Sequence, residues 1–443
     1  MFRPRIAPAI AAIAATLLAA CGGGSDAGGD DGTITFWYAM AGRNGEAIQA
    51  MVDTFNQQHE GEIRVEAVYQ GNYYDTLNKL KAAIQSGQTP NLVQVFEIGT
   101  QLMIDLQSSV PFGEMAEEAG YSLDDLQPRL VDYYTVDGTL YSLPFNASAP
   151  MLYYNKTAFE EVGLDPEQPP QTLEEVAEAA ERLTIRRGGQ TERYGYVAAI
   201  DGWLIEQMMA NTDLPYCDQG NGREGRPTAV NWTNPTVENM LGWWRDLVER
   251  GIALNVGRNN NDASAAFQSG RAAILPFTAA NMRDIITGSD FEVGVAYYPK
   301  AEPGTGGGVF NGGGSIWTMA GHPESEQEAA FEFLKYVASP EAQATWAAAT
   351  GYIPVSLAAR DHPVFQDVLA EYPDFAKPGE QLLESEITVA SRGCLMGTMP
   401  EARDQMNTAI ERVLLGNATP ADALAAATES MGRVIETYNQ SVS

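Results

Sequence analysis

Apolar residues follow two different periods in the first hundred positions. Three short segments that are β-branched, aromatic or continuously apolar predict strands over residues 33–38, 63–68 and 92–96. The segments between them carry apolar residues at helical spacing, first Ile48, Met51, Val52 and Phe55, then Leu77, Leu80 and Ile84. Strands that alternate with helices predict an α/β fold, in which ligands bind beyond the carboxyl ends of the strands. Glu97 directly follows the third strand and is therefore a candidate ligand-binding residue.

The order of elements is more mixed in the second part of the chain. Apolar runs predict strands over residues 151–155, 272–277, 291–298 and 315–319. Thr172 is a predicted helix N-cap, and Thr419 is another, followed by Pro420 at the first helical position. The glycine-rich residues 304–314 predict a loop that leads into the last of these strands.

The N-terminal segment has the pattern of an export signal. Arg3 and Arg5 precede an apolar run over residues 6–20, which is too short to span a bilayer and is typical of a signal peptide. The small residues before Cys21, and the Gly/Ser/Asp segment after it, resemble a bacterial lipoprotein lipobox. That resemblance implies a signal peptide over residues 1–20, acylation of Cys21 and a flexible tether over residues 21–32. An ordinary secretory signal with an incidental cysteine is the alternative.

Length and charge narrow the remaining possibilities. The part after the signal has about 420 residues, which is too long for one ordinary core and predicts two lobes. The formal charge of −31 argues against a nucleic-acid interface and against docking on anionic lipid headgroups. Cys217 and Cys394 could pair in an oxidising compartment, but the sequence leaves open whether they do or remain buried free thiols.

The chemistry of common enzymes is missing from the sequence. There are three histidines, far apart in the chain, and there is no HExxH, paired CxxC, GxSxG or Gly-Lys motif. The single GxGxxG, at Gly220, Gly222 and Gly225, lies between neither a strand nor a helix and is interpreted as a polar loop. We therefore expect no catalytic residue, no metal site and no cofactor.

Several segments together resemble the extracellular solute-binding proteins of carbohydrate-type ABC importers. They are residues 154–156, 163–166, 266–273 and 351–354. Four others are closer to the sn-glycerol-3-phosphate-binding branch, namely residues 36–37, 71–73, 94–99 and 144–148. The resemblance implies a two-lobe periplasmic-binding-protein fold of type II, similar to maltose-binding protein, with mixed sheets flanked by helices and a ligand cleft between the lobes. It places residues 33–146 and 313–356 in the N-terminal lobe, and residues 147–312 and 357–443 in the C-terminal lobe.

The resemblance also implies a ligand-binding set, matched position by position: Tyr73, Glu97, Ser148, Asp201, Trp203, Thr278, Gly313, Tyr352 and Arg403. Arg403 matches the phosphate-binding arginine, and its planar guanidinium suits a phosphate. Glu97 is expected to accept hydrogen bonds from glycerol hydroxyls. Gly313 would let backbone N–H groups approach an oxyanion.

One position departs from the glycerol-3-phosphate pattern. Ile200 stands where the family has the first of two tryptophans, while Trp203 keeps the second. We expect the smaller side chain to enlarge the pocket, so that a glycerophosphodiester such as glycerophosphocholine can enter. Trp203 could then meet a quaternary ammonium by a cation–π interaction, and Asp201 could add charge complementarity.

The resemblance predicts that the protein is a monomeric receptor rather than an enzyme. It would close its lobes over a small phosphorylated polyol and deliver it to a membrane permease that works with a cytoplasmic ATPase. The alternatives are an oligosaccharide or polyol receptor of the same fold and, from another class, a secreted phosphodiester hydrolase.

Overall fold

The computed structural model describes residues 32–442. The predicted signal peptide, Cys21 and most of the tether lie outside the described residues. Within this range, no helix has the length and apolar character needed to cross a membrane. The same residues contain no group of three or more His, Cys, Asp or Glu side chains that could hold a metal ion.

The larger sheet has six strands. Their order is β2-β1-β3-β15-β4, with β7 pairing to β15, and their bounds are β1 (Thr33–Tyr38), β2 (Arg64–Tyr69), β3 (Leu92–Phe96), β4 (Ser109–Val110), β7 (Leu143–Ser148) and β15 (Gly312–Met319). β1 runs parallel to β2 and β3, whereas β15 is antiparallel to β3, β4 and β7. The sheet is therefore mixed, and all five residues of β3 are buried, as its apolar run predicts.

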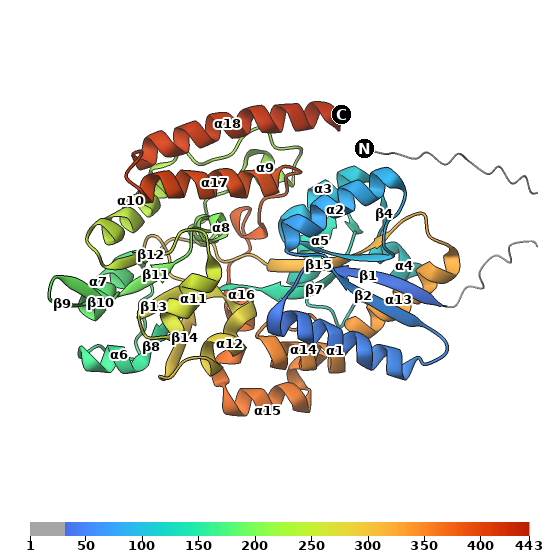
Figure 1. Ribbon diagram of the computed structural model, residues 1–443. Helices are drawn as coiled ribbons and strands as arrows, with labels where there is room; N and C mark the ends of the chain where they lie inside the picture. Colours follow the sequence, from blue (N-terminus) through green and yellow to red (C-terminus); the bar gives the residue numbers. More distant parts are fainter. Residues whose placement is uncertain (1–31, 443) are drawn as a thin grey trace, which may run out of the picture. The chain divides into compact units, whose positions relative to one another are not determined.

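Helices that precede β15 in the sequence and helices that follow it pack on this sheet (Figure 1). The elements of this lobe are α1 (Gly42–Gln58), α2 (Tyr73–Ser86), η1 (Glu97–Gly99), α3 (Thr100–Leu106), α4 (Phe112–Glu118), α5 (Pro128–Tyr134), α13 (Glu324–Val337) and α14 (Pro340–Thr350), with the hairpin β5 (Thr135–Val136) and β6 (Thr139–Leu140). α1 buries its predicted apolar stripe. α2 begins in a capping box made by Asn72 and Asp75 and ends at Gly87, whose φ of 66° is the left-handed conformation that glycine adopts readily.

The second sheet has three antiparallel strands in the order β13-β8-β14. They are β8 (Pro150–Asn155), β13 (Ile274–Thr278) and β14 (Val293–Tyr297), and two further pairs lie in this lobe: β9 (Ile185–Arg187) with β10 (Gln190–Arg193), and β11 (Tyr196–Ala198) with β12 (Ala253–Asn255).

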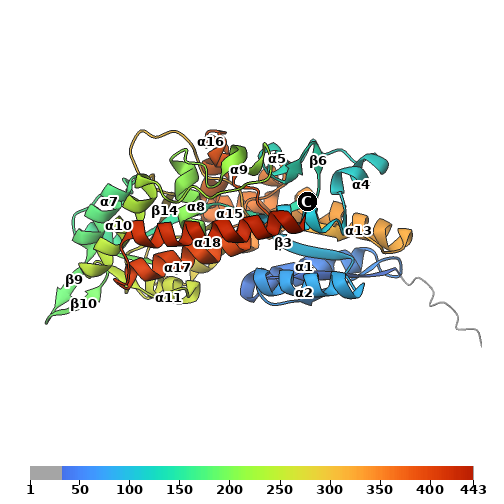
Figure 2. The ribbon, with the colours of Figure 1, turned by 90° about the horizontal axis from the view of Figure 1, so that it is seen from above.

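The remaining helices include those that carry the candidate site. They are α6 (Lys156–Glu161), α7 (Leu173–Leu183), α8 (Gly202–Asn211), α9 (Asp218–Gly222), α10 (Pro235–Glu249), α11 (Asn260–Gln268), η2 (Ala279–Asn281), α12 (Met282–Thr287), η3 (Ala358–Asp361), α15 (Pro363–Glu371), η4 (Pro373–Ala376), α16 (Lys377–Glu384), η5 (Ala390–Arg392), α17 (Met399–Leu414) and α18 (Pro420–Ser441). Thr172 and Thr419 cap α7 and α18 as predicted. α17 and α18 lie side by side (Figures 1 and 2).

The chain passes between the two sheets where β7 ends and β8 begins, and it returns in the segment before β15. The predicted glycine loop is shorter than expected, because Gly312, Gly313 and Gly314 belong to β15 and pair with β7. The lobe boundaries inferred from the resemblance remain a prediction.

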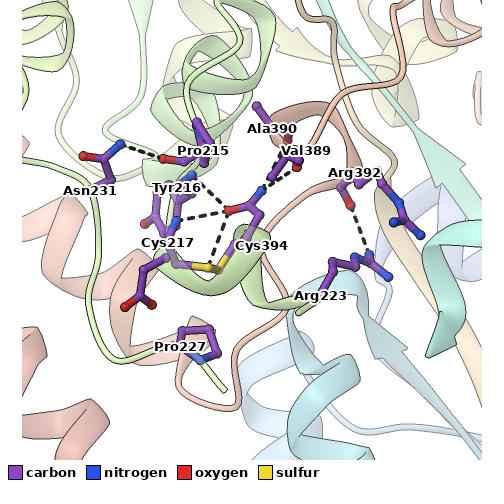
Figure 3. The surroundings of a disulfide bond; sticks show 12 residues. Pro215, Tyr216, Cys217, Arg223, Pro227, Asn231, Val389, Ala390, Arg392 and Cys394 are labelled. Carbon is purple, nitrogen blue, oxygen red and sulfur yellow. Dashed lines mark hydrogen bonds between the residues drawn. A yellow bond between two sulfur atoms is a disulfide. The ribbon is translucent and has the colours of Figure 1, made fainter. Parts of the chain in front are cut away.

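Cys217 and Cys394 form a disulfide bond, and their Cα atoms lie 6.1 Å apart (Figure 3). The side chain of Asn221 fastens the same two segments, because it accepts hydrogen bonds from the backbone N–H of Tyr216 and Cys217 and donates to the carbonyl of Val389. The question that the sequence left open is thus resolved in the structure in favour of a crosslink.

Candidate functional site

A cavity of about 270 Å³ lies where the two lobes face each other. All nine residues of the predicted ligand-binding set line it: Tyr73, Glu97, Ser148, Asp201, Trp203, Thr278, Gly313, Tyr352 and Arg403. They come from elements as distant in sequence as α2 and α17, so the structure brings together positions that the sequence alone could only match to a family pattern.

Arg403 is the centre of a buried ionic cluster. It lies in the second turn of α17, and its Nη2 atom donates to Oε1 of Glu97 at 2.9 Å and to Oε2 of Glu206 at 2.7 Å. Its Nε atom also donates to Glu206, at 3.2 Å. The side chain of Arg403 is only 9% exposed, so the guanidinium does not point into bulk water.

Burial and mutual charge set the protonation of this cluster. Burial raises the pKa of Glu97, and Arg403 opposes that rise. Burial also raises the pKa of Glu206 to about 7, again against Arg403 and with a further contribution from Glu97. Burial by itself lowers the pKa of Arg403, but the two carboxylates outweigh it, so the pKa stays above its ordinary value and the guanidinium is charged.

Polar side chains of the larger sheet hold Tyr73 in place. Its ring stacks on Phe96 with centroids 5.2 Å apart, and its hydroxyl accepts a hydrogen bond of 2.8 Å from Nδ2 of Asn146. Asn146 in turn accepts from Gln94 at 2.9 Å. Burial raises the pKa of Tyr73 well above its usual value, so the phenol keeps its proton and can donate it to an acceptor in the cavity.

The two sheets each contribute one hydroxyl to the cavity. Oγ of Ser148 and Oγ1 of Thr278 lie 2.7 Å apart, at the ends of β7 and β13. Two contacts also join α1 to the second lobe at this cavity. Arg43 forms an ion pair with Asp284, and Nδ2 of Asn44 donates to the carbonyl of Ala280 at 3.3 Å.

Gly313 occupies a position that no other residue fits. Its φ is +96°, and a Cβ atom there would lie 1.8 Å from the carbonyl oxygen of Asn146. At the neighbouring Gly312, a Cβ atom would lie 2.8 Å from Cζ2 of Trp203. The glycines therefore let β15 approach both β7 and the indole of Trp203, which lines the cavity.

Helix α8 carries three residues of the site in its first turns. Asp201 is its N-cap and accepts a hydrogen bond of 3.0 Å from the backbone N–H of Trp203. Glu206 follows Trp203 by three residues and therefore lies on the same face of the helix. Ile200 is buried and is not one of the residues that line the cavity, so the structure does not place position 200 in the wall.

Sequence reasoning missed Glu206 and a set of amides. Glu206 could have been found from its spacing to Trp203, because residues three apart on a helix share a face. The other missed polar residues that line the cavity are Asn44, Asn260, Asn261, Ser264 and Asn281. Three of them lie in the first turns of α11, which gives that wall side-chain amides and a hydroxyl.

Comparison with known proteins agrees with this architecture. Residues 50–376 match the family model of the bacterial extracellular solute-binding proteins. The chain is 31% identical over 415 residues to the sn-glycerol-3-phosphate-binding periplasmic protein UgpB of Pectobacterium atrosepticum, covering 92% of each chain.

Two solved structures share the fold. UgpB from Mycobacterium tuberculosis, in complex with glycerophosphocholine, has a TM-score of 0.77 and 21% identity, over 92% of this chain and 99% of that one. The maltose-bound MalE3 of T. maritima has a TM-score of 0.74 and 20% identity, over 91% of this chain and 99% of that one. The arrangement is thus the two-lobe fold of maltose-binding-protein-like receptors.

Proposed function

Because this chain belongs to the bacterial extracellular solute-binding proteins, we propose that its cavity binds a glycerophosphate ligand, either a glycerophosphodiester such as glycerophosphocholine or sn-glycerol-3-phosphate. Proteins of this family serve ABC importers and are receptors rather than enzymes, so a phosphodiester hydrolase is set aside. The ligand would be delivered to a membrane permease. Lipidation at Cys21 would keep a monomeric receptor close to that permease.

The buried guanidinium of Arg403 carries the proposal. Among the described residues that line the cavity, it is the only arginine or lysine, in a chain whose formal charge is −31. A phosphate can reach a positive charge here and can also accept hydrogen bonds from Tyr73 and from the hydroxyls of Ser148 and Thr278. Glu97 would accept hydrogen bonds from the glycerol hydroxyls, as its position beside Arg403 allows.

The part of the ligand beyond the phosphate is expected at Trp203 and Asp201. An aromatic face and a carboxylate together suit a quaternary ammonium, and the cation–π part is worth about 0.5–2 kcal/mol. Since position 200 does not line the cavity, preference for the diester rests on these two residues and not on the missing tryptophan.

Binding is expected to close the two lobes. The cavity has walls from both, and Arg43 and Asn44 of α1 contact the second lobe at its edge. A ligand that touches both walls stabilises the arrangement in which they are close, so it shifts the population towards the closed form.

An oligosaccharide receptor is the second candidate, because similar folds include a maltose-bound protein. The cavity volume of about 270 Å³ argues against it, since it lies just below the ~300–1,000 Å³ that ligand pockets usually have. An oligosaccharide also carries no negative charge that could pair with the guanidinium of Arg403.

Calorimetric titration with glycerophosphocholine, sn-glycerol-3-phosphate and maltose tests the proposal. We expect the native protein to bind at least one glycerophosphate and not maltose. Arg403→Ala should weaken phosphate binding by about 2–5 kcal/mol, since it removes a buried charge partner. Arg258→Ala is the matched control, because Arg258 also pairs with two acids, Asp404 and Glu411 of α17, but is 38% exposed and lies outside the cavity.

Thermal unfolding of both variants should accompany the titrations, so that loss of binding is separated from loss of fold. If the native protein binds maltose and neither glycerophosphate, the proposal is wrong and the sugar receptor replaces it.

A further inference from the structure

A second carboxylate lies behind the guanidinium of Arg403. The side chain of Glu206 is 1% exposed, and it accepts hydrogen bonds from both Nε and Nη2 of Arg403. Unlike Glu97, it is not one of the residues that line the cavity. Glu206 therefore acts on a ligand through Arg403, as a positioning residue.

The cluster has an excess of negative charge. One guanidinium faces two carboxylates, so the three side chains sum to −1 when all are ionised, and Asp201 adds a further acid close by. A phosphodiester brings another negative charge into the same buried space. Like charges that lose their water raise each other's free energy, and a buried carboxylate relieves this by taking up a proton.

We propose that binding of a phosphodiester is coupled to the uptake of one proton from solvent by the Glu206 carboxylate. This inference rests on the proposed glycerophosphate function. The buffer gives up the proton, and Glu206 becomes a neutral carboxylic acid. Arg403 is then balanced by Glu97 alone, and the positive charge that Glu206 held becomes available to the phosphate.

The surroundings of Glu206 support this assignment. Charged and titratable groups face it from several elements: Arg403 of α17, Glu97 of η1, Asp201 at the start of α8, Tyr74 of α2, Tyr133 of α5, and Tyr216. Burial raises the pKa of all three tyrosines, so they stay neutral near pH 7. Burial also raises the pKa of Glu206 to about 7, where uptake of a proton is inexpensive.

The sign of the pH dependence follows from the added charge. A bound phosphate raises the pKa of Glu206 further, so the complex holds the proton at a pH where the free protein has released it. Affinity should be constant below about pH 7, and should fall by about tenfold per pH unit above it until the complex also loses the proton.

Calorimetry of the native protein with glycerophosphocholine measures the coupling directly. This ligand is the suitable probe because its phosphodiester does not change protonation state near neutral pH, whereas a phosphate monoester has a second pKa of about 6. Titrations at about pH 6 and about pH 8, each in two buffers of different ionisation enthalpy, give the number of protons taken up. We expect close to one proton per ligand at the higher pH and close to none at the lower.

Glu206→Gln identifies the group. Glutamine keeps the size of the side chain and an oxygen that can accept from Arg403, but it cannot take up a proton. The variant should bind glycerophosphocholine equally well at both pH values, with the affinity that the native protein has at the lower pH, and without proton uptake.

The outcomes separate this inference from the proposed function. Binding by the native protein without proton uptake overturns the inference and leaves the glycerophosphate function intact. Proton uptake that persists in Glu206→Gln also overturns it, because another group then carries the proton. Absence of glycerophosphocholine binding at both pH values overturns the inference. If sn-glycerol-3-phosphate does not bind either, the proposed function is wrong as well. If the variant does not fold, the proton count of the native protein still decides whether coupling exists, and Glu206→Asp, which retains a titrating carboxyl, should keep the proton uptake.

Discussion

Arg403 and Glu97 are 306 residues apart in the sequence, yet Nη2 of the arginine lies 2.9 Å from Oε1 of the glutamate. Glu97 directly follows β3 of the larger sheet, and Arg403 lies on α17, which packs on α8, α10 and α18. Both residues line the cavity, and their ion pair is buried at both ends. Removing one partner of such a buried pair strongly destabilises the folded protein, because the other charge is left without compensation.

The ion pair between Arg43 and Asp284 should contribute to ligand retention, though only modestly. Its side chains are 45% and 40% exposed, and exposed pairs are usually worth about 0–1 kcal/mol. We expect Arg43→Ala to weaken ligand binding by less than about tenfold, mainly through faster dissociation. A double-mutant cycle with Asp284→Ala, measured by stopped-flow release of the ligand, isolates the pair.

Arg64→Ala is the control for that cycle, because Arg64 pairs with Glu66 on β2 and is more exposed still. It should leave ligand release unchanged. Equal dissociation rates for the native protein and Arg43→Ala would mean that the pair has no part in closure.

Gly313→Ala should destabilise the protein and disturb the site. The new Cβ would lie 1.8 Å from the carbonyl oxygen of Asn146, and the φ of +96° is itself unfavourable for alanine. Backbone strain and overpacking each cost about 1–3 kcal/mol, so the free energy of unfolding should fall by several kcal/mol. Urea denaturation measures this change.

Gly321→Ala separates the two causes. Gly321 also has a positive φ, +89°, but its Cβ would meet nothing within 4 Å. It should show the conformational cost alone, about 1 kcal/mol. A loss at Gly313 no larger than that at Gly321 would contradict the close packing of β15 on β7.

The strands and helices near the N-terminus could be predicted because local pattern decides them. The buried run of β3, the apolar stripe of α1 and the left-handed Gly87 at the end of α2 are each determined within a few residues. The start of β15 could not be predicted in this way. Its three glycines have the composition of a loop, and their pairing with β7, together with that of Gly314 with β3, makes them a strand.

The candidate site divides in the same manner. The nine residues matched to the family line one cavity, but the sequence could not indicate that Arg403 has two acidic partners. Glu206 is one of 58 acidic residues, and only its burial behind the guanidinium distinguishes it. The contribution of α11 was missed for a similar reason, because Asn260 and Asn261 have the ordinary composition of a helix start.

The disulfide between Cys217 and Cys394 should contribute substantially to stability. The two cysteines are 177 residues apart, and closing a loop of that length in the unfolded chain corresponds to about 5 kcal/mol in the chain-entropy model, with about 2–5 kcal/mol usually observed. Replacing both by serine should therefore lower the midpoint of denaturation markedly. Addition of a reductant should lower the midpoint of the native protein and leave the double variant unchanged. An insensitive native protein would show that the bond is absent.

Glu206 should also make the stability of the ligand-free protein depend on pH. Burial raises its pKa to about 7, while in the unfolded chain a glutamate titrates near pH ~4.3. Between these values the folded state binds more protons than the unfolded state, so the free energy of unfolding falls as pH rises through this window. Glu206→Gln removes that contribution. Relative to the native protein, the variant should therefore gain stability on going from about pH 4 to about pH 7, by on the order of 3 kcal/mol.

Urea denaturation of both proteins across this range gives the pH dependence of the free energy of unfolding for each. The difference between the two slopes removes the contribution of the other carboxylates, which both proteins share. Glu411→Gln is a control, since Glu411 pairs with Arg258 on the surface of the same helix that carries Arg403, and its slope should match the native protein closely. Parallel stability curves for the native protein and Glu206→Gln would mean that Glu206 is already ionised at low pH in the folded state, held so by Arg403.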